Sequence, residues 1–134
     1  RSDIDDFKDI NDTLGHAGGD IALKTIADRM KQIRSQILTP YRFAGDEFIM
    51  ILCSAQEKLV EKVAYDCRNI FTGEVQFKNK THKVTGSIGL ASYPKDAFDT
   101  ETLISCADDA MYQVKRSGKN QFAYYQPKKT KPKS

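Results

Sequence analysis

Two adjacent carboxylates, Asp46 and Glu47, lie between two short apolar segments of this 134-residue chain. The segments span residues 37–43 and 48–52, and Gly45 stands in the connection between them. Two apolar runs joined by a few glycine and acidic residues predict a β-hairpin. Because adjacent acids at a hairpin tip repel each other and add nothing to a core, we expect them to bind a cation or transfer a proton.

A second group of acids opens the chain at residues 3–6. An EF-hand loop starting at Asp3 would need a glycine where Lys8 stands and a glutamate where Leu14 stands, which excludes that kind of calcium site. Asp5 or Asp6 is well placed to cap a helix, which leaves Asp3 as the best ligand candidate. Since a rigid element usually presents such an acid, we expect the chain to begin at the end of a strand.

An aspartate-nucleophile phosphatase would also place Asp-x-Asp after a strand, with Asp108 and Asp109 as distant metal partners. These two acids follow Ala107 and precede Ala110 and Met111 within a helical pattern. Acids at such positions are more simply explained as solvated residues on the surface of a helix. The phosphatase hypothesis is therefore the weaker alternative.

Residues 11–20 contain three glycines and are typical of a loop that leads into a helix. Asp20 stands where that helix would begin, so an N-cap would explain it without any ligand. The alternative is a purine site in which Asn11 and Asp20 present an amide and a carboxylate to the base. Guanine suits such a carboxylate because it offers a ring N–H and an exocyclic amine as donors.

Lys115 and Lys119 lie one turn apart where a helical pattern ends at Gly118. The helix dipole favours cations at this end, which is a sufficient structural explanation. The functional alternative is that the two ammonium groups bind the phosphates of a triphosphate.

The spacing of apolar residues predicts an α+β domain, layered as in α/β proteins, with helices packed on a mostly antiparallel sheet. Helices are expected at residues 20–34, 59–71 and 103–114. Strands are expected at 41–43 and 48–52, around 75–77, through 84–90 and at 122–125. We expect this domain to occupy residues 1–126 and residues 127–134 to be a disordered Lys- and Pro-rich tail or linker.

The net charge of +3 comes from that tail, which holds four of the 21 basic residues and leaves 17 against 18 acids elsewhere. A nucleic-acid surface is therefore not expected. No apolar run in these residues is long enough for a membrane span, and none has the pattern of a signal peptide. The three cysteines lack metal-ligand spacing, so we expect them to be packed free thiols in a reducing cytoplasm.

Together these motifs resemble those of the GGDEF diguanylate cyclases. They are Asp-Ile-Asp-x-Phe-Lys from Asp3, the asparagine at 11, His-x-x-Gly-Asp from His16, Gly-Asp-Glu-Phe from Gly45, and Lys-x-x-Gly-Lys-Asn from Lys115. The resemblance extends from residue 3 to about residue 125. It implies a palm-like sheet with flanking helices, of the nucleotidyl-cyclase type. Family members usually begin several dozen residues earlier, so the first helix and strand are expected to be missing here.

The resemblance also implies a magnesium or manganese site formed by Asp3, Asp46 and Glu47 with the backbone carbonyl of Ile4. Asp46 would in addition help to deprotonate an attacking 3′-hydroxyl. Lys8 would stabilise charge on the phosphates in the transition state. In such a site the protein mainly positions and polarises the reacting groups.

For the substrate, the resemblance implies that Asn11 and Asp20 recognise the guanine of GTP, with His16 nearby, and that Lys115 and Lys119 hold the terminal phosphates. The implied reaction condenses two GTP into cyclic di-GMP and two pyrophosphates, in bacterial second-messenger signalling. Each monomer would hold one GTP, so a homodimer would form the active site. A sensory domain before residue 1, no membrane contact by this domain and a cytoplasmic location are expected.

Two departures from the family pattern bear on activity. Ala44 replaces the first glycine of the GGDEF motif, where a methyl group could crowd the nucleotide or oppose a positive φ angle. Ser35 and Leu38 replace the Arg and Asp of the product-inhibition motif, so no inhibitory site is expected. An alternative function is therefore a weak or inactive module that binds GTP or dimerises and regulates a partner such as a cyclic di-GMP phosphodiesterase domain.

Overall fold

The computed structural model of this chain describes residues 1–35, 38–53 and 56–127. The elements of the described residues are, in chain order, β1 (Ser2–Ile4), α1 (Phe7–Ile33), β2 (Leu38–Ala44), β3 (Glu47–Leu52), α2 (Glu57–Phe71), β4 (Gly73–Phe77), β5 (Lys80–Val84), β6 (Gly86–Leu90), α3 (Thr100–Arg116) and β7 (Phe122–Tyr124). The predicted hairpin at residues 37–52 is present as β2 and β3. The predicted α+β class is confirmed.

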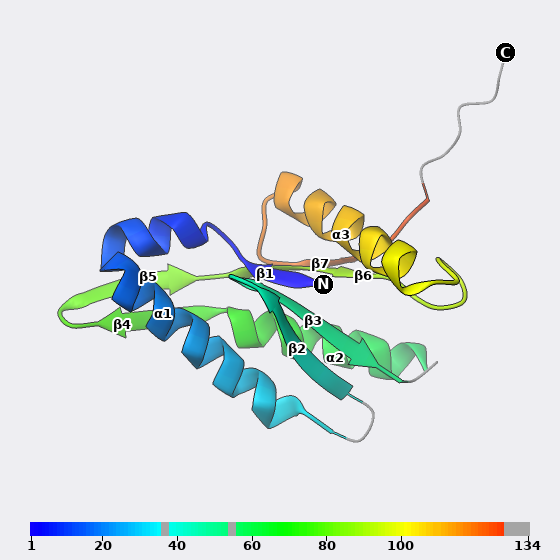
Figure 1. The fold of residues 1–134 in the computed structure, drawn as a ribbon, viewed down its shortest axis with the longest axis horizontal. Helices are drawn as coiled ribbons and strands as arrows, with labels where there is room; N and C mark the ends of the chain where they lie inside the picture. Colours follow the sequence, from blue (N-terminus) through cyan, green and yellow to red (C-terminus); the bar gives the residue numbers. More distant parts are fainter. Residues whose placement is uncertain (36–37, 54–55, 128–134) are drawn as a thin grey trace, which may run out of the picture.

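The main sheet has five strands in the order β2-β3-β1-β6-β7 (Figure 1). The short strand β1 is central and pairs antiparallel with both β3 and β6. The pairing of β6 with β7 is parallel, whereas β2 and β3 are antiparallel. The sheet is therefore mostly antiparallel, as predicted, and β4 and β5 form a separate two-stranded hairpin.

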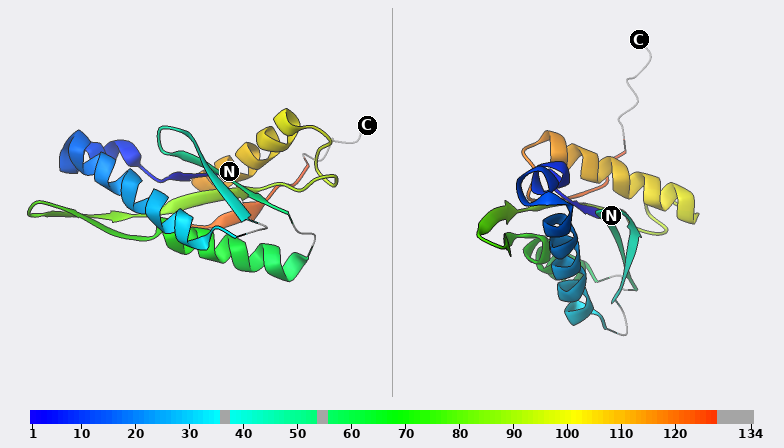
Figure 2. Two further views of the ribbon diagram at one scale, coloured as in Figure 1. Left: turned by 60° about the horizontal axis from the view of Figure 1, so that its bottom comes forward. Right: turned by 60° about the vertical axis from the view of Figure 1, so that its left-hand side comes forward.

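Helices cover both faces of the sheet, with α3 on one face and α1 and α2 on the other (Figures 1 and 2). A Cβ atom at Gly89 of β6 would collide with the backbone of α3 at Ala107 and Met111, so glycine lets this helix lie directly on the strand. A Cβ atom at Gly86 would collide with Phe71, the last residue of α2. The first of these close approaches positions α3 and the second positions α2 relative to the sheet.

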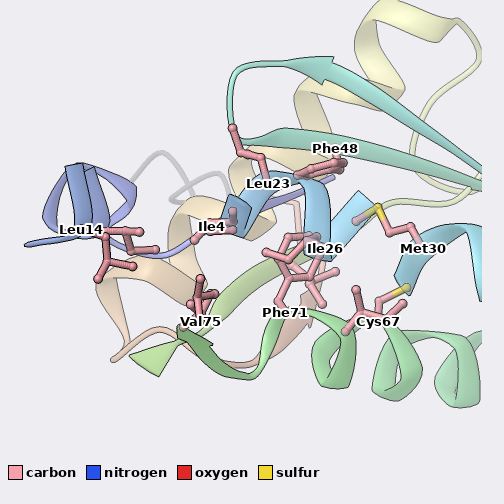
Figure 3. Packing of buried hydrophobic residues seen from close by; sticks show 14 residues of the cluster. Ile4, Leu14, Leu23, Ile26, Met30, Phe48, Cys67, Phe71 and Val75 are labelled. Atoms are coloured by element: carbon pink, nitrogen blue, oxygen red, sulfur yellow. The ribbon is translucent and has the colours of Figure 1, made fainter. Parts of the chain in front are cut away.

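The hydrophobic core lies between the sheet and the pair of helices α1 and α2 (Figure 3). Phe48 and Phe71 are almost completely buried at its centre and meet edge to face, with ring centroids 5.7 Å apart. Each such aromatic side chain contributes about 1.5–3 kcal/mol by burial. Phe48 belongs to the strand that follows the acidic turn, so the core holds one side of the turn in place.

Helix α1 begins at Phe7, thirteen residues before the predicted start, so the prediction of a loop at residues 11–20 is wrong. The helix is interrupted at Gly15, which has φ 75° and ψ 170°. Ile10 and Leu14, ahead of this break, are buried and extend the apolar face of the helix. Asp20 consequently lies inside α1, and its interpretation as an N-cap is wrong.

Other departures are smaller. The single strand predicted at residues 84–90 is divided at Thr85, where the chain passes from the β4–β5 hairpin into the main sheet. Cys67 and Cys106 are buried as expected, but Cys53 is exposed. Most of the predicted tail, residues 128–134, lies outside the described residues. Among the residues that are described, no helix is both long and apolar enough to cross a membrane.

Candidate functional site

Asp3 and Asp46 are brought to the same end of the sheet by the pairing of β1 with β3. Asp3 is the middle residue of β1 and lies opposite Glu47, and Asp46 immediately precedes Glu47 in the turn. The side chain of Asp3 is only 12% exposed. Its charge interacts with that of Asp46, so the acids that the sequence places 43 positions apart belong to one site.

Burial dominates the electrostatics of this acid pair. It raises the pKa of Asp3 to about 6, against the opposing effect of Lys115, and the negative charges of Asp46 and Asp5 raise it further. Burial also raises the pKa of Asp46, where Lys115 again opposes the shift. Two desolvated carboxyl groups that repel each other form a site that a cation would stabilise.

Lys115 in the last turn of α3 supplies a positive charge to these acids. Its Nζ lies 2.6 Å from Oδ1 of Asp3 and 3.3 Å from Oδ1 of Asp5. Burial acts to lower the pKa of Lys115, but the ion pairs with Asp3 and Asp5 outweigh it and raise the pKa. The ammonium group is therefore held in its charged form between the two carboxylates.

Asp5 is the shared acceptor of several hydrogen bonds, a role that the sequence analysis did not predict. Its buried carboxylate accepts hydrogen bonds from the Ser87 hydroxyl at 2.5 Å, the Thr85 hydroxyl at 2.7 Å and the Asn120 amide at 3.0 Å. These bonds join the end of β1 to β6 and to the turn after α3. The hydroxyl residues Thr85 and Ser87 within an otherwise apolar strand were the available sequence signal.

Asp6 occupies the N-cap position of α1, but in the left-handed conformation and without a side-chain capping bond, so its interpretation as a capping side chain is wrong. It pairs instead with Lys119, whose Nζ lies 2.6 Å from its Oδ1. The two lysines predicted to bind phosphate, Lys115 and Lys119, are thus held by different acids at neighbouring points of the structure.

Arg1 connects the hairpin to α3. Its guanidinium lies 2.8 Å from Oε2 of Glu47 and 2.9 Å from Oδ1 of Asp108. Asp108, expected to be a solvated surface acid, is partly exposed but pairs with Arg1, and Glu47, expected to be a metal ligand, has the same arginine partner. The sequence interpretation missed this network because no motif includes Arg1.

The two candidate guanine residues both lie on α1, on either side of its break. A Cβ atom at Gly19 would collide with Oδ1 of Asn11, so the asparagine amide packs against the turn that carries Asp20. Asp20 lines a hollow of about 340 Å³, together with Leu23 on α1 and Arg42 on β2. The lining is completed by Lys24, Ala27, Asp28 and Lys31. Charged residues therefore predominate in it, and Asn11 does not contribute to it.

Lys8 and His16 are exposed on α1, and the structure records no contact between them and the acid pair within the described residues. Ser35 follows α1 and Leu38 is the first residue of β2, and the Leu38 amide donates to the Ser35 hydroxyl at 3.2 Å. Leu38 is buried. These positions thus belong to the connection into the hairpin.

The turn of the hairpin places its unusual backbone conformation on Gly45 and not on Ala44. Ala44 is the last residue of β2 and pairs with Glu47. Gly45 has φ 52°, and its carbonyl accepts a hydrogen bond from Nε of Arg42 at 2.9 Å. Because the left-handed residue is the glycine that is retained, the alanine does not oppose a positive φ angle.

A metal ion at this site would have two side-chain carboxylates. Among the described residues, no group of three or more His, Cys, Asp or Glu side chains is arranged to hold a metal. Asp3 and Asp46 nevertheless fit Mg²⁺, which is usually bound by one or two carboxylates together with substrate phosphates. Their desolvation and mutual repulsion are what a bound divalent cation would relieve.

The sheet, its helices and the acid pair at the hairpin turn define a cyclase-type α+β domain. Residues 2–121 match the family described as diguanylate cyclase, GGDEF domain, and the chain belongs to this family. The family motif is present at residues 44–48 in the form Ala-Gly-Asp-Glu-Phe. The resemblance inferred from the sequence motifs is thereby confirmed.

Relatives of this chain include a protein named as a diguanylate cyclase and one named as a cyclic di-GMP phosphodiesterase. The chain is 37% identical to "Diguanylate cyclase A" of Treponema denticola, covering 88% of this chain and 32% of the relative. It is 31% identical to "Cyclic di-GMP phosphodiesterase NbdA" of Pseudomonas aeruginosa, covering 92% of this chain and 16% of the relative. The chain thus spans a third or less of the length of these relatives.

A solved structure with a similar fold is the GGDEF domain of YfiN (TpbB) from Pseudomonas aeruginosa, with a TM-score of 0.86 and 31% sequence identity. The match covers 94% of this chain and 80% of the solved one. The fold of the described residues is therefore that of a GGDEF domain.

Proposed function

We propose that this chain is the catalytic domain of a diguanylate cyclase that condenses two GTP into cyclic di-GMP and two pyrophosphates in bacterial signalling. The observation that carries the proposal is the meeting of Asp3, Asp46 and Lys115 at the end of the central strand. In each transfer a 3′-oxygen forms a bond to the α-phosphorus of the other GTP. The bond to the β-phosphate breaks, pyrophosphate leaves, and the hydroxyl releases its proton.

Asp3 and Asp46, with the backbone carbonyl of Ile4, are the proposed ligands for Mg²⁺ or Mn²⁺. When bound, such a metal lowers the pKa of coordinated oxygens and neutralises charge on the phosphoryl group. Asp46 also helps to take the proton of the attacking hydroxyl. Glu47 is a further proposed ligand, and because its ion pair with Arg1 uses Oε2, it would offer the metal its other oxygen.

Asn11 and Asp20 are the proposed guanine-recognising residues. The packing of Asn11 against the turn before Asp20 and the hollow lined by Asp20 and Leu23 support this role. The carboxylate of Asp20 accepts from the ring N–H and the exocyclic amine, a donor pair that adenine lacks. His16 on the same helix is a weaker candidate for contact with the base.

Three lysines are proposed to act on the phosphates. Lys115 and Lys119 bind the terminal phosphates, which requires each to exchange its acidic partner for the nucleotide. Lys8, exposed in the first turn of α1, stabilises charge in the transition state. The expected active form is a cytoplasmic homodimer with one GTP per subunit, regulated by a sensory domain that precedes residue 1.

A second candidate function is a GTP-binding or dimerising module that regulates a partner domain without catalysis. The specific observation in its favour is the similarity to NbdA, which is named as a phosphodiesterase. The retained acid pair favours the cyclase, because a regulatory module has no need of two desolvated carboxylates beside a lysine.

The two candidates are separated by incubating the full-length protein with GTP and Mg²⁺ and measuring cyclic di-GMP by mass spectrometry. We expect product from the unchanged protein. The Asp46→Asn variant, which removes the ligand and base, should reduce the rate by about 100-fold or more. No product from the unchanged protein, together with retained GTP binding, would establish the regulatory module instead.

Feedback inhibition at residues 35 and 38 is not expected, because neither a serine hydroxyl nor a buried leucine can grip a guanine and phosphate as arginine and aspartate do. Turnover measured with and without micromolar cyclic di-GMP should therefore be equal. Suppressed turnover with product bound beside Ser35 would contradict this expectation.

A further inference from the structure

Lys115 is paired with the same carboxylate that the proposed function assigns to the metal. Its Nζ lies 2.6 Å from Oδ1 of Asp3, and the two side chains are 26% and 12% exposed. The second oxygen of Asp3 is free to face a metal, but a divalent cation bound there would lie close to the Lys115 ammonium and be repelled by it. The ion pair therefore competes with metal binding at Asp3.

The second partner of Lys115 is fixed in position. Asp5 is buried and accepts hydrogen bonds from Ser87, Thr85 and the Asn120 amide, so its carboxylate does not depend on Lys115 for its place. The Lys115 ammonium lies 3.3 Å from it. A lysine that leaves Asp3 thus keeps an anionic neighbour and stays at the site.

We infer that Lys115 acts as an internal cation on Asp3 and thereby couples the binding of the metal to the binding of the triphosphate. The inference rests on the proposed cyclase function, which supplies both ligands. Lys115 neutralises Asp3 while no metal is bound. When Asp3 coordinates a metal, Lys115 is released, remains beside Asp5 and becomes available to the phosphates.

This exchange makes each ligand favour the other. Mg²⁺ alone must bind Asp3 against the positive charge of Lys115 and therefore binds weakly. A triphosphate gives the displaced ammonium a new anionic partner, so Mg²⁺ binds more tightly when the nucleotide is present. By thermodynamic linkage, Mg²⁺ must then raise the affinity for the triphosphate by the same factor.

Lys119, which lies just after α3 and four residues beyond Lys115, offers a matched control. It makes an ion pair of the same length, 2.6 Å, but with Asp6, which is half exposed and is not a proposed metal ligand. Removing the charge of Lys119 changes the net charge as much as removing that of Lys115. It leaves Asp3 and its partner in place.

The test is titration calorimetry of the full chain with Mg²⁺ alone, and then with Mg²⁺ in the presence of guanosine 5′-(α,β-methylene)triphosphate, which cannot release pyrophosphate. Lys115→Gln should bind Mg²⁺ alone about fivefold more tightly than the unchanged protein, the size expected when one partly exposed ion pair no longer has to be broken. It should bind the nucleotide more weakly and show a smaller coupling factor.

Lys119→Gln should bind Mg²⁺ alone as the unchanged protein does. Lys115→Arg keeps a cation at Asp3 and should not show the fivefold gain in Mg²⁺ affinity. It keeps the inference testable if Lys115→Gln does not fold. Equal Mg²⁺ affinity in Lys115→Gln and the unchanged protein, or an equal gain in Lys119→Gln, would overturn the inference. Because these measurements need no turnover, a protein that shows the coupling but makes no cyclic di-GMP would refute only the proposed function.

Discussion

Among the departures from the family motif, Ala44 is the one most expected to reduce activity. The backbone conformation of the turn argues against such a reduction. The left-handed conformation belongs to Gly45, and Ala44 ends an extended strand. We therefore predict that Ala44→Gly raises the rate of cyclic di-GMP formation by less than about threefold, since no positive φ angle is relieved. Steady-state rates of both proteins at saturating GTP provide the measurement. A gain of tenfold or more would mean that the methyl group itself obstructs the nucleotide.

Asp3 makes the stability of the domain depend on pH. Because burial raises its pKa from 3.8 to about 6, the folded state retains a proton in this interval that the unfolded chain has released. The contribution of Asp3 to stability is therefore greatest below pH 4 and is lost as the pH rises through 6. The Asp3→Asn side chain cannot ionise, so the stability of this variant should not fall in the same way as the pH rises.

The expected change is about 1–2 kcal/mol, after allowance for solvent screening. Urea unfolding of both proteins in a chelator, at pH 4.5 and pH 7, should show the unchanged protein losing stability relative to Asp3→Asn at the higher pH. A difference that stays constant, or that changes in the opposite direction, would show that Asp3 is ionised throughout.

At the scale of elements, Asp5 joins the end of β1 to the start of β6 and to the turn after α3. Asp5→Ala removes the acceptor for two hydroxyl groups and one backbone amide, and leaves the buried Ser87 hydroxyl without this partner. We expect a loss of about 2–4 kcal/mol in the free energy of unfolding, as for a buried network that loses its shared acceptor. Asp12→Ala, at an exposed position of α1, is the control and should change stability by less than about 0.5 kcal/mol. Similar losses in both variants would rule out the anchoring role.

The elements that the sequence predicts well are those with local signals. The hairpin follows from apolar runs around Gly45, and α3 follows from apolar spacing that ends at Gly118. The first half of α1 could not be predicted, because three glycines in ten residues oppose a helix. Burial of Ile10 and Leu14 overrides that propensity.

The site could be predicted only in part for a related reason. The motif acids and lysines have recognisable types and spacings, but their pairing depends on the order of strands in the sheet. A three-residue strand such as β1 is too short to show any periodicity. The positions of Arg1 and Asp5 follow from β1, so neither the Arg1–Glu47 ion pair nor the Asp5 anchor could be predicted locally.

At the scale of the whole molecule, one subunit offers a single acid pair and a single candidate guanine hollow within its described residues. In the proposed reaction each GTP is attacked by the other, so the proposal requires two such subunits to face each other. The specific activity should therefore rise with protein concentration below the dissociation constant of the dimer and level off above it. Initial rates over a hundredfold dilution series, at saturating GTP and Mg²⁺, give this dependence directly.

Mixing provides the control for that dilution series. A tenfold excess of Asp46→Asn sequesters most unchanged subunits in mixed dimers, which hold only one complete acid pair. If both subunits must supply Asp46, random pairing should reduce the activity per unchanged subunit to about a tenth. An excess of Asp12→Ala, which alters no proposed site residue, should cause no such reduction. Specific activity that is constant on dilution and unaffected by the Asp46→Asn excess would show that a single subunit completes the reaction.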